Sequence, residues 1–531
     1  MERLAPKALN YDNALPLAIE SRANRRSFVP VNGSSFSNST GATIIRIDVN
    51  ADSMLDAANS YLQVSLKNDT AVANENLFRE IGPAFIQRLR IESGGVTIED
   101  IDEYGRLYTA MMLHQCPEDY VKNVYGNMGL YPKNESINGQ IIAAQVGAAG
   151  VNASSASQSS APAFHANGAA AIAAGAIGCA TDEIQYHGCF EAYSRGIGQN
   201  GLPLASAAAN HPLHGVGMQA NTRGLGGAIG PGASRVLTIP LLSGFLNMDK
   251  YVPLIMMNAG FTIEIHLAAT AKVGCNVTEG NAAGGADAAS ALVAAGPAYS
   301  VNSVKYVANL IDLDRSFYDK LRNVMEGSGG VLQLAGQTYR HYGGVLTAGL
   351  STNTITLPAR VKSVKSIFGT FISTANKNSA VAYNTGVFED AELINYRFEV
   401  GSVRYPATDV QVQSTTGQSE AYCELHKAFG KLGDYSHSSC VKPKHYTQVL
   451  PNHTATPLTL EDNCLQAFML GHDFEAFQKV ALESGINTAD RSLPINFICS
   501  KTAGDAMTAD FYVLSDAIYY INLDGTVSVS V

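Results

Sequence analysis

The chain has 531 residues and a net charge of −10, and 46% of its residues are hydrophobic whereas only 15% are charged. This composition excludes disorder throughout, and the length predicts two domains, or one domain with very long insertions. The 49 glycines and many short alternating runs favour β structure with frequent turns. Arg22, Arg25 and Arg26 form the only basic cluster, so a solvated arm is favoured there over contact with nucleic acid.

The cysteine pattern and the N-terminal residues predict a chain that stays in a reducing compartment. No CxxC motif or paired spacing occurs, so free thiols are expected at Cys116, Cys179, Cys189, Cys275, Cys423, Cys440, Cys464 and Cys499. The first residues lack the layout of a signal peptide, so N-x-S/T triplets such as those at Asn38 and Asn134 are interpreted as chance. The best candidate for a membrane span, residues 251–267, contains Glu264 and His266 and is predicted to be a strand.

The first part of the chain alternates between apolar and polar residues. Residues 1–27 show little periodicity and are expected to form an extended arm. Residues 43–49, 61–67 and 85–92 then predict three one-sided strands, which are typical of an antiparallel sandwich. Gly94 ends the third strand.

A helix is predicted directly after this strand. Thr97 and Asp100 have the spacing of a capping box at its start. Ile101, Tyr104, Tyr108 and Met111 then recur at helical spacing. One amphipathic strand therefore leads into one amphipathic helix, and both need a large apolar partner.

Long stretches of small residues interrupt the strands that follow. Residues 126–232 are dominated by Ala, Gly, Ser and Asn, so we interpret them as a long insertion packed against neighbouring subunits, with a floppy loop as the alternative. Strands are predicted at 236–242, 261–267 and 304–310, with a second Ala/Gly-rich loop at 270–297. Asp314 is predicted to cap a short helix that ends near Gly327.

The second half repeats this order. Strands are predicted at 331–342, 354–372 and 393–400, and a helix at 419–432 with Tyr422, Leu425, Phe429 and Leu432 on its inner face. The shared order of a strand, a Gly or Pro break and a helix predicts two copies of one fold. The chain ends in a predicted hairpin with a type I′ turn at Asp524-Gly525.

Three motifs suggest chemistry, but the residues around each motif argue against it. Gly215, Gly217 and Ala220 match a dinucleotide-binding GxGxxA motif, yet no strand precedes it, so chance is favoured. A zinc site could be built only from residues whose spacing fits no common zinc module, namely Cys179, His187, Cys189, His211 and His214. The acidic residues Glu99, Asp100, Asp102 and Glu103 could bind a divalent ion, but acids at a helix start are favoured by the helix dipole. We therefore predict no catalytic, cofactor-binding or metal-binding residues, and no cofactor.

Three stretches together resemble a known family. They are residues 27–68 (SFVPVNGSSFSNSTGATIIRIDVNADSMLDAANSYLQVSLKN), residues 85–115 (FIQRLRIESGGVTIEDIDEYGRLYTAMMLHQ) and residues 251–267 (YVPLIMMNAGFTIEIHL). They resemble the double jelly-roll major capsid proteins, most closely those of polinton-like viruses and virophages. The resemblance runs over residues 28–110 and 233–330 and more loosely to the C-terminus.

The resemblance implies an all-β fold of two consecutive eight-stranded antiparallel jelly rolls with short helices and long loop insertions. It divides the chain into an N-terminal arm (1–27), a first jelly roll (28–312, with insertions at 126–232 and 270–297), a linker helix (313–329) and a second jelly roll (330–531).

The function that the resemblance implies is that of a major capsid protein without enzymatic activity. Such a protein self-assembles into pseudo-hexameric homotrimeric capsomers that form the shell of an icosahedral DNA virus. The implied partners are neighbouring capsomers, penton and minor capsid proteins and, through outward loops, a host surface, but no sequence-specific nucleic acid. The implied location is the capsid of the virion, assembled inside the host cell.

Two alternatives remain open from the sequence. A lectin-like β-sandwich that binds carbohydrate is disfavoured by the absence of Trp, but 24 tyrosines could provide aromatic platforms. A β-sandwich hydrolase is the weaker alternative, because no acid pair on facing strands is evident.

Overall fold

The protein is described by a computed structural model. It describes residues 20–38, 41–69, 83–117, 120–125, 127–130, 232–248, 250–273, 298–327, 329–377, 385, 388–412, 418–434, 436–441, 446, 467–476, 484–489, 493–502 and 504–531.

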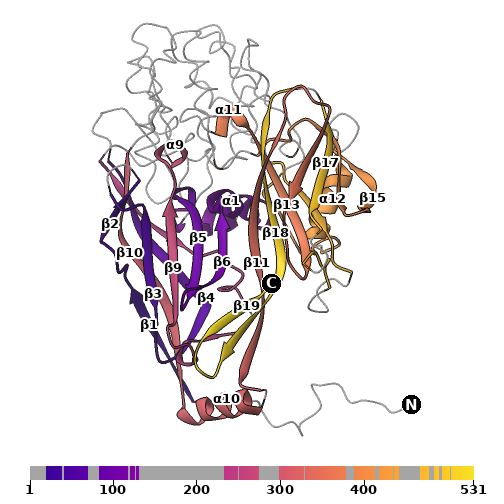
Figure 1. Cartoon of the computed structure of the whole chain (residues 1–531). Coiled ribbons are helices and arrows are strands. Elements are labelled where there is room, and N and C mark those ends of the chain that lie inside the picture. Colours follow the sequence, from indigo (N-terminus) through magenta and orange to yellow (C-terminus); the bar gives the residue numbers. More distant parts are fainter. Residues whose placement is uncertain are drawn as a thin grey trace, which may run out of the picture.

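Four antiparallel sheets make up the described part of the chain, two in each half (Figure 1). The strands of the first half are β1 (Ser21–Phe28), β2 (Ser35–Ser37), β3 (Ile44–Val49), β4 (Met54–Asn68), β5 (Ile86–Ser93), β6 (Val96–Asp102), β7 (Ser234–Ile239), β8 (Val252–Pro253), β9 (Phe261–Leu267) and β10 (Tyr299–Leu313). Those of the second half are β11 (Val331–Leu346), β12 (Thr352–Leu357), β13 (Val364–Ser373), β14 (Leu393–Val400), β15 (Val403–Gln411), β16 (Leu470–Asp473), β17 (Ile495–Lys501), β18 (Met507–Asn522) and β19 (Val527–Ser530).

Both halves have the same strand topology. The two sheets of the first half have the orders β1-β10-β4-β7 and β3-β9-β5-β6, and those of the second half β11-β18-β13-β16 and β12-β17-β14-β15. When the eight strands in these orders are renumbered 1 to 8 along the chain in each half, the two sheets of both halves have the strand orders 1-8-3-6 and 2-7-4-5. Two facing sheets whose strands alternate in this way form a jelly roll. The chain therefore contains the same jelly roll twice.

The alternation in the sequence explains which face of each strand is buried. In β3, Ile45, Ile47 and Val49 are buried while the residues between them are exposed, as the sequence predicted. Strands β5 and β14 occupy the same place in the two jelly rolls and have the same pattern of buried and half-buried residues along eight positions. Period-two alternation gives each sheet one apolar face, and two such faces close each core.

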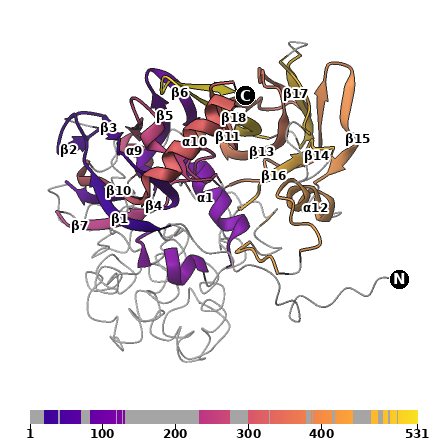
Figure 2. The same cartoon turned by 90° about the horizontal axis from the view of Figure 1, so that it is seen from below.

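Helices occupy equivalent places between the strands. Helix α1 (Tyr104–Gln115) follows β6 in the first jelly roll, and α12 (Ser419–Ala428) follows β15, the equivalent strand of the second. Helix α10 (Arg315–Gly327) lies at the base of the molecule and joins β10 to β11 (Figure 2). The backbone N–H of Phe317 donates to the carbonyl oxygen of Asp314, which confirms the predicted start of this helix. Two further short helices, α9 (Thr270–Val273) and α11 (Thr374–Lys377), precede stretches outside the described residues.

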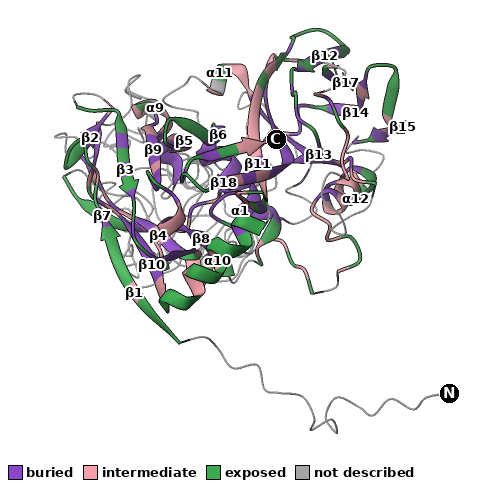
Figure 3. Ribbon diagram, turned by 60° about the horizontal axis from the view of Figure 1, so that its bottom comes forward, coloured by how far each residue is buried: buried purple, intermediate pink, exposed green. Residues whose placement is uncertain are grey.

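The predicted arm is partly wrong. Ser21–Phe28 is not a separate extended arm but strand β1 of a sheet, which pairs with β10 along its whole length. The pattern misled us because six of the eight residues of β1 are exposed, so no buried face imposes alternation on the sequence (Figure 3). Residues 1–19 lie outside the described part of the chain.

The predicted helix start at Thr97 is also wrong. Gly94 and Gly95 both have positive φ, 55° and 85°, and form a two-residue turn that pairs β5 with β6 in a hairpin. Thr97 and Asp100 are therefore strand residues, and the helix begins only at Tyr104.

Two smaller predictions about the second half need correction. Leu432 lies beyond the end of α12 and is 59% exposed, so it does not belong to the inner face. The terminal hairpin is confirmed, but its turn is not of type I′. Only Gly525 has positive φ (78°), and its N–H donates to the carbonyl oxygen of Asn522. This is the three-residue hairpin loop with a glycine bulge.

Candidate functional site at the junction of the two jelly rolls

The two jelly rolls meet along a junction where strand β6 of the first lies against β11 of the second and helix α1 of the first bonds to β18 through Arg106 and Asp510 (Figures 1 and 2). Eleven of the twelve residues of α1 are buried. The helix can be apolar on all sides because one jelly roll covers one side of it and the second covers the other. The partner that its sequence requires is thus supplied by the second half of the chain.

Glu99 on β6 forms the first polar connection across the junction. It is 2% exposed and accepts hydrogen bonds from the N–H of Gly244 (3.0 Å) and the hydroxyl of Ser243. From β11 of the other jelly roll, Thr338 Oγ1 donates to Glu99 at 3.3 Å and the N–H of Tyr339 at 3.4 Å. Burial raises the pKa of Glu99, although these hydrogen bonds act against it. One carboxyl group therefore ties together two backbone segments from opposite jelly rolls.

Glycines allow the two backbones to approach closely. A Cβ on Gly244 would lie 1.7 Å from the carbonyl oxygen of Gln337 on β11. A Cβ on Gly525, in the terminal hairpin, would lie 2.6 Å from the backbone nitrogen of Asn258. That nitrogen donates to the carbonyl oxygen of Gly525 at 3.0 Å. Any larger residue at either glycine would push the jelly rolls apart.

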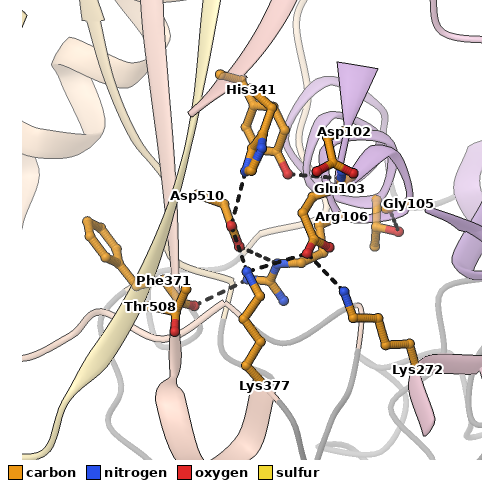
Figure 4. A network of polar contacts seen from close by, with 12 residues as sticks. Asp102, Glu103, Gly105, Arg106, Lys272, His341, Phe371, Lys377, Thr508 and Asp510 are labelled. Carbon is orange, nitrogen blue, oxygen red and sulfur yellow. Dashed lines mark hydrogen bonds and ion pairs between the residues drawn. The ribbon is translucent and has the colours of Figure 1, made fainter. Parts of the chain in front are cut away.

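A buried charged cluster forms the second polar connection (Figure 4). Asp510 on β18 is fully buried; Arg106 Nε from α1 lies 3.3 Å from its Oδ2. His341 Nε2 and Lys377 Nζ lie 3.1 and 2.8 Å from its Oδ1. Burial alone would raise the pKa of Asp510, but the hydrogen bond from His341 and the charges of Arg106 and Lys377 outweigh it, so this pKa lies well below the usual range.

Arg106 and Glu103 extend the cluster into the first jelly roll. The guanidinium of Arg106 lies over the ring of Phe388 at 4.8 Å and donates to the carbonyl oxygen of Phe371. Glu103 lies 2.9 Å from Lys272 Nζ and 3.4 Å from Lys377 Nζ. Burial opposes ionisation of Glu103, but the two lysines lower its pKa below the ordinary value. Each buried charge therefore has a partner of opposite sign, as burial requires.

The end of α1 is fixed by a buried histidine. His114 Nε2 lies 2.9 Å from the carbonyl oxygen of Ala467, and its ring packs edge-on against Tyr446. Burial lowers the pKa of His114 to about 3, so the imidazole is neutral near pH 7. The carbonyl oxygen of Leu113 accepts from the N–H of Cys440 at 3.0 Å. Both ends of α1 are thus bonded to the second jelly roll.

These contacts hold two domains in one orientation. No group of three or more His, Cys, Asp or Glu side chains in the described ranges could hold a metal ion. Among those same residues, no helix is long and apolar enough to cross a membrane. The polar groups at the junction bond to one another across it, an arrangement suited to mechanical rigidity.

The four acidic residues that the sequence analysis considered for a divalent ion do not form one site. Glu99 faces the junction, whereas Asp100 accepts a hydrogen bond from Arg88 Nε at 2.6 Å on the neighbouring strand. Asp102 accepts from the side chain of Gln87 and from the backbone N–H of Glu103. Alternation along β6 puts Glu99 on the side opposite to Asp100 and Asp102, and Glu103 lies beyond the strand and pairs with Lys272 and Lys377.

The other sequence candidates fall elsewhere. The GxGxxA motif and the histidines and cysteines considered for zinc all lie outside the described residues. Arg22, Arg25 and Arg26 lie on exposed β1, where Arg25 donates to Tyr61 Oη at 2.9 Å. Within the described part of the chain, Cys116, Cys423, Cys440 and Cys499 are free thiols.

Sequence analysis missed the charged cluster. Its members are far apart in the chain, at positions 103, 106, 272, 341, 377 and 510. One signal was available: Arg106 is the only permanently charged residue in the otherwise apolar helix YGRLYTAMMLHQ. A lone arginine in an apolar helix needs a buried acidic partner.

Solved structures with the same fold exist, although no family model and no curated protein matches the sequence. A crystal structure of PBCV-1 VP54, fitted into a cryo-EM reconstruction of the virophage Sputnik, is 10% identical with a TM-score of 0.50, covering 98% of this chain and 99% of that chain. A quasi-atomic structure of the PBCV-1 virus capsid is 9% identical, also with a TM-score of 0.50 and the same coverage. The mavirus major capsid protein is 11% identical with a TM-score of 0.47, covering 100% of this chain and 95% of its own.

The first two likenesses extend over both halves of the chain. They confirm the predicted fold class, two consecutive antiparallel jelly rolls with short helices, and with it the resemblance to double jelly-roll capsid proteins at the level of the fold.

Proposed function

We propose that this protein is a major capsid protein that forms the shell of an icosahedral DNA virus and is located in the virion. The observation that carries this proposal is the pair of topologically identical jelly rolls in one chain, an arrangement shared with PBCV-1 VP54 over 98% of the sequence. In this proposal the first jelly roll extends to β10, helix α10 is the linker, and the second jelly roll begins at β11.

The geometry supports a homotrimeric capsomer. Each chain supplies two similar wedges held at a fixed angle by the junction, so three chains closing a ring would place six similar wedges around one axis. Such a pseudo-hexamer can tile a shell with neighbouring capsomers, while penton and minor capsid proteins would occupy the remaining positions. Outward loops would be free to contact a host surface, and no sequence-specific contact with nucleic acid is proposed.

We propose no enzymatic role. The polar residues at the junction are paired with one another across two domains, which suits a structural role. The lectin alternative has no support from the fold, and the chain contains no Trp for a sugar-stacking platform.

Assembly of the purified protein tests this proposal. Light scattering at micromolar concentration should give particles of three chains of 56.2 kDa each, and electron micrographs should show hexagonal outlines. A stable monomer that shows no assembly at any salt concentration would refute it. Binding on a glycan array by such a monomer would support the lectin instead.

A further inference from the structure

Each element that meets at the junction has an equivalent element in the other jelly roll. These equivalent elements lie on the outside of the molecule and are left uncovered. The junction joins the fifth strand of the first jelly roll, β6, to the first strand of the second, β11, and the helix after β6, α1, bonds to β18 through Arg106 and Asp510. Because both jelly rolls have one topology, the corresponding unused elements are β15 and α12 on the second and β1 on the first. They lie on opposite outer flanks of the molecule (Figure 1).

The elements at the junction are more buried than the equivalent elements on the outer flanks. In α1 eleven of twelve residues are buried, but in α12 only three of ten are. In β11 four of sixteen residues are exposed, whereas in β1 six of eight are. In β6 three residues are buried, and in the longer β15 only one is. The difference is visible in Figure 3, where β1 is largely exposed.

We infer that β1 and the loop after it on one copy pack against β15 and α12 of a second copy, so that the contact between chains repeats the contact within the chain. This inference rests on the proposed capsomer and assigns the surfaces that build it. Because the two surfaces differ, the contact is head-to-tail, and a head-to-tail contact closes into a ring when the angle permits. The junction sets the two jelly rolls of one chain at an angle to each other. If the contact between chains repeats this angle, the ring closes.

Each flank presents apolar side chains on ordered backbone. After β1, Val29 and Val31 are 65% and 61% exposed, and the N–H of Val31 donates to the carbonyl oxygen of Arg46 on β3 at 2.9 Å. After α12, Leu432 is 59% exposed, and the N–H of the preceding Lys431 donates to the carbonyl oxygen of His426 at 2.8 Å. Val29, Val31 and Leu432 are therefore the apolar side chains that a second copy would cover on the two flanks.

The register indicates which part of β15 would be covered. Strands β5 and β14 share one burial pattern; Glu99 lies opposite Ile91 on β5, and Tyr405 lies opposite the equivalent Phe398 on β14. Glu99 is the residue that bonds across the junction within the chain. Ala407, two residues after Tyr405, is exposed in the stretch of β15 that has no partner on β14, so a substitution there alters the outer surface of this strand.

Two paired substitutions test the assignment in the full chain. Val29→Asp with Val31→Asp alters only the first flank, and Ala407→Asp with Leu432→Asp alters only the second. Either pair should weaken association by at least about 100-fold, because carboxylates would be buried without partners. Light scattering should then give one chain per particle. Val324→Asp on α10, which is 60% exposed and belongs to neither flank, is the control and should remain trimeric.

Mixing the two variants distinguishes head-to-tail contact from like-with-like contact. Each variant keeps one intact flank, and the intact flanks are complementary, so the mixture should form a two-chain species that neither variant forms alone. If one paired variant still self-associates while the other does not, the flanks pair like with like and the inference is overturned. Far-UV circular dichroism and the thermal midpoint establish that every variant is folded; if a paired variant is unfolded, Val29→Ser with Val31→Ser or Leu432→Ser replaces it.

The two proposals fail differently. If the wild-type protein is a monomer, the proposed capsomer fails. If the wild-type protein and both folded paired variants are all trimeric, the capsomer stands and only this assignment of its contact surfaces is overturned.

Discussion

Replacing Gly244 with alanine should force the two jelly rolls apart. The added Cβ would lie 1.7 Å from the carbonyl oxygen of Gln337 and 2.4 Å from the carbon of the same group. Both atoms are backbone, so no side chain can rotate away. An ordinary contact needs about 3.4 Å, so the turn that contains Gly244 and β11 must separate by roughly 1.7 Å.

This separation would break hydrogen bonds to a buried group. From β11, Glu99 accepts from Thr338 Oγ1 at 3.3 Å and from the N–H of Tyr339 at 3.4 Å, and neither bond survives a movement of that size. Each buried polar group left without a partner costs about 1–3 kcal/mol, and the overpacking adds about 1–3 kcal/mol. The free energy of unfolding should therefore fall by about 4 kcal/mol.

Urea denaturation followed by far-UV circular dichroism measures this loss, because the chain has no Trp for fluorescence. Gly343→Ala is the matched control: it lies on β11, and the nearest side-chain atom to its added Cβ is 3.8 Å away. The control should stay within about 1 kcal/mol of the wild type. If Gly244→Ala unfolds at the same urea concentration as this control, the argument from close backbone approach is refuted.

Three further predictions concern the same junction. Arg106→Met should lower the free energy of unfolding by about 3 kcal/mol, because Asp510 stays buried with fewer cations around it. His114 has a folded pKa of about 3 against 6.5 when unfolded, so the unfolded chain binds the extra proton and stability should fall as pH falls from about 6.5 towards 3, by about 2 kcal/mol at pH 5. Gly525→Ala should cost about 2 kcal/mol, since φ is 78° and the Cβ would lie 2.6 Å from Asn258 N.

Each of these has its own check. Arg322→Met removes an exposed pair with Glu326 and should cost less than about 0.5 kcal/mol, so equal losses for the two arginines would contradict the role given to the buried cluster. Comparison of His114→Gln with the wild type at pH 7 and pH 5 should show a smaller loss in the variant; parallel losses would exclude His114 as the cause. For Gly525, unchanged stability of the alanine variant would mean that the terminal hairpin does not press on the first jelly roll.

Much of the fold could be predicted because local alternation reports a buried face. Residues such as Ile45, Ile47 and Val49 lie on one side of a strand whose other side is exposed, and the sequence shows it directly. The repeat of a strand, a break and a helix predicted two copies of one fold, and the matching strand orders agree with it. Where exposure is nearly uniform, as in β1, the same method fails.

The β6 segment shows how a local signal can be overruled. Thr97, Asp100 and the acids around them have the chemistry of a helix start. A strand forms instead because the two glycines turn the chain back onto β5. In addition, β11 of the second jelly roll provides hydrogen-bond donors to Glu99. Neither the hairpin register nor those donors can be inferred from the residues next to Thr97.

The sequence by itself determined the alternating strands, the linker helix after Asp314 and the repeated order of elements, because each of these depends on neighbours within a few residues. Only the tertiary structure decided that Glu99, Arg106 and Asp510 are junction residues, because their partners are hundreds of residues away in the chain. A buried charge is stable only beside a specific partner, and local sequence carries no information about which distant segment brings that partner.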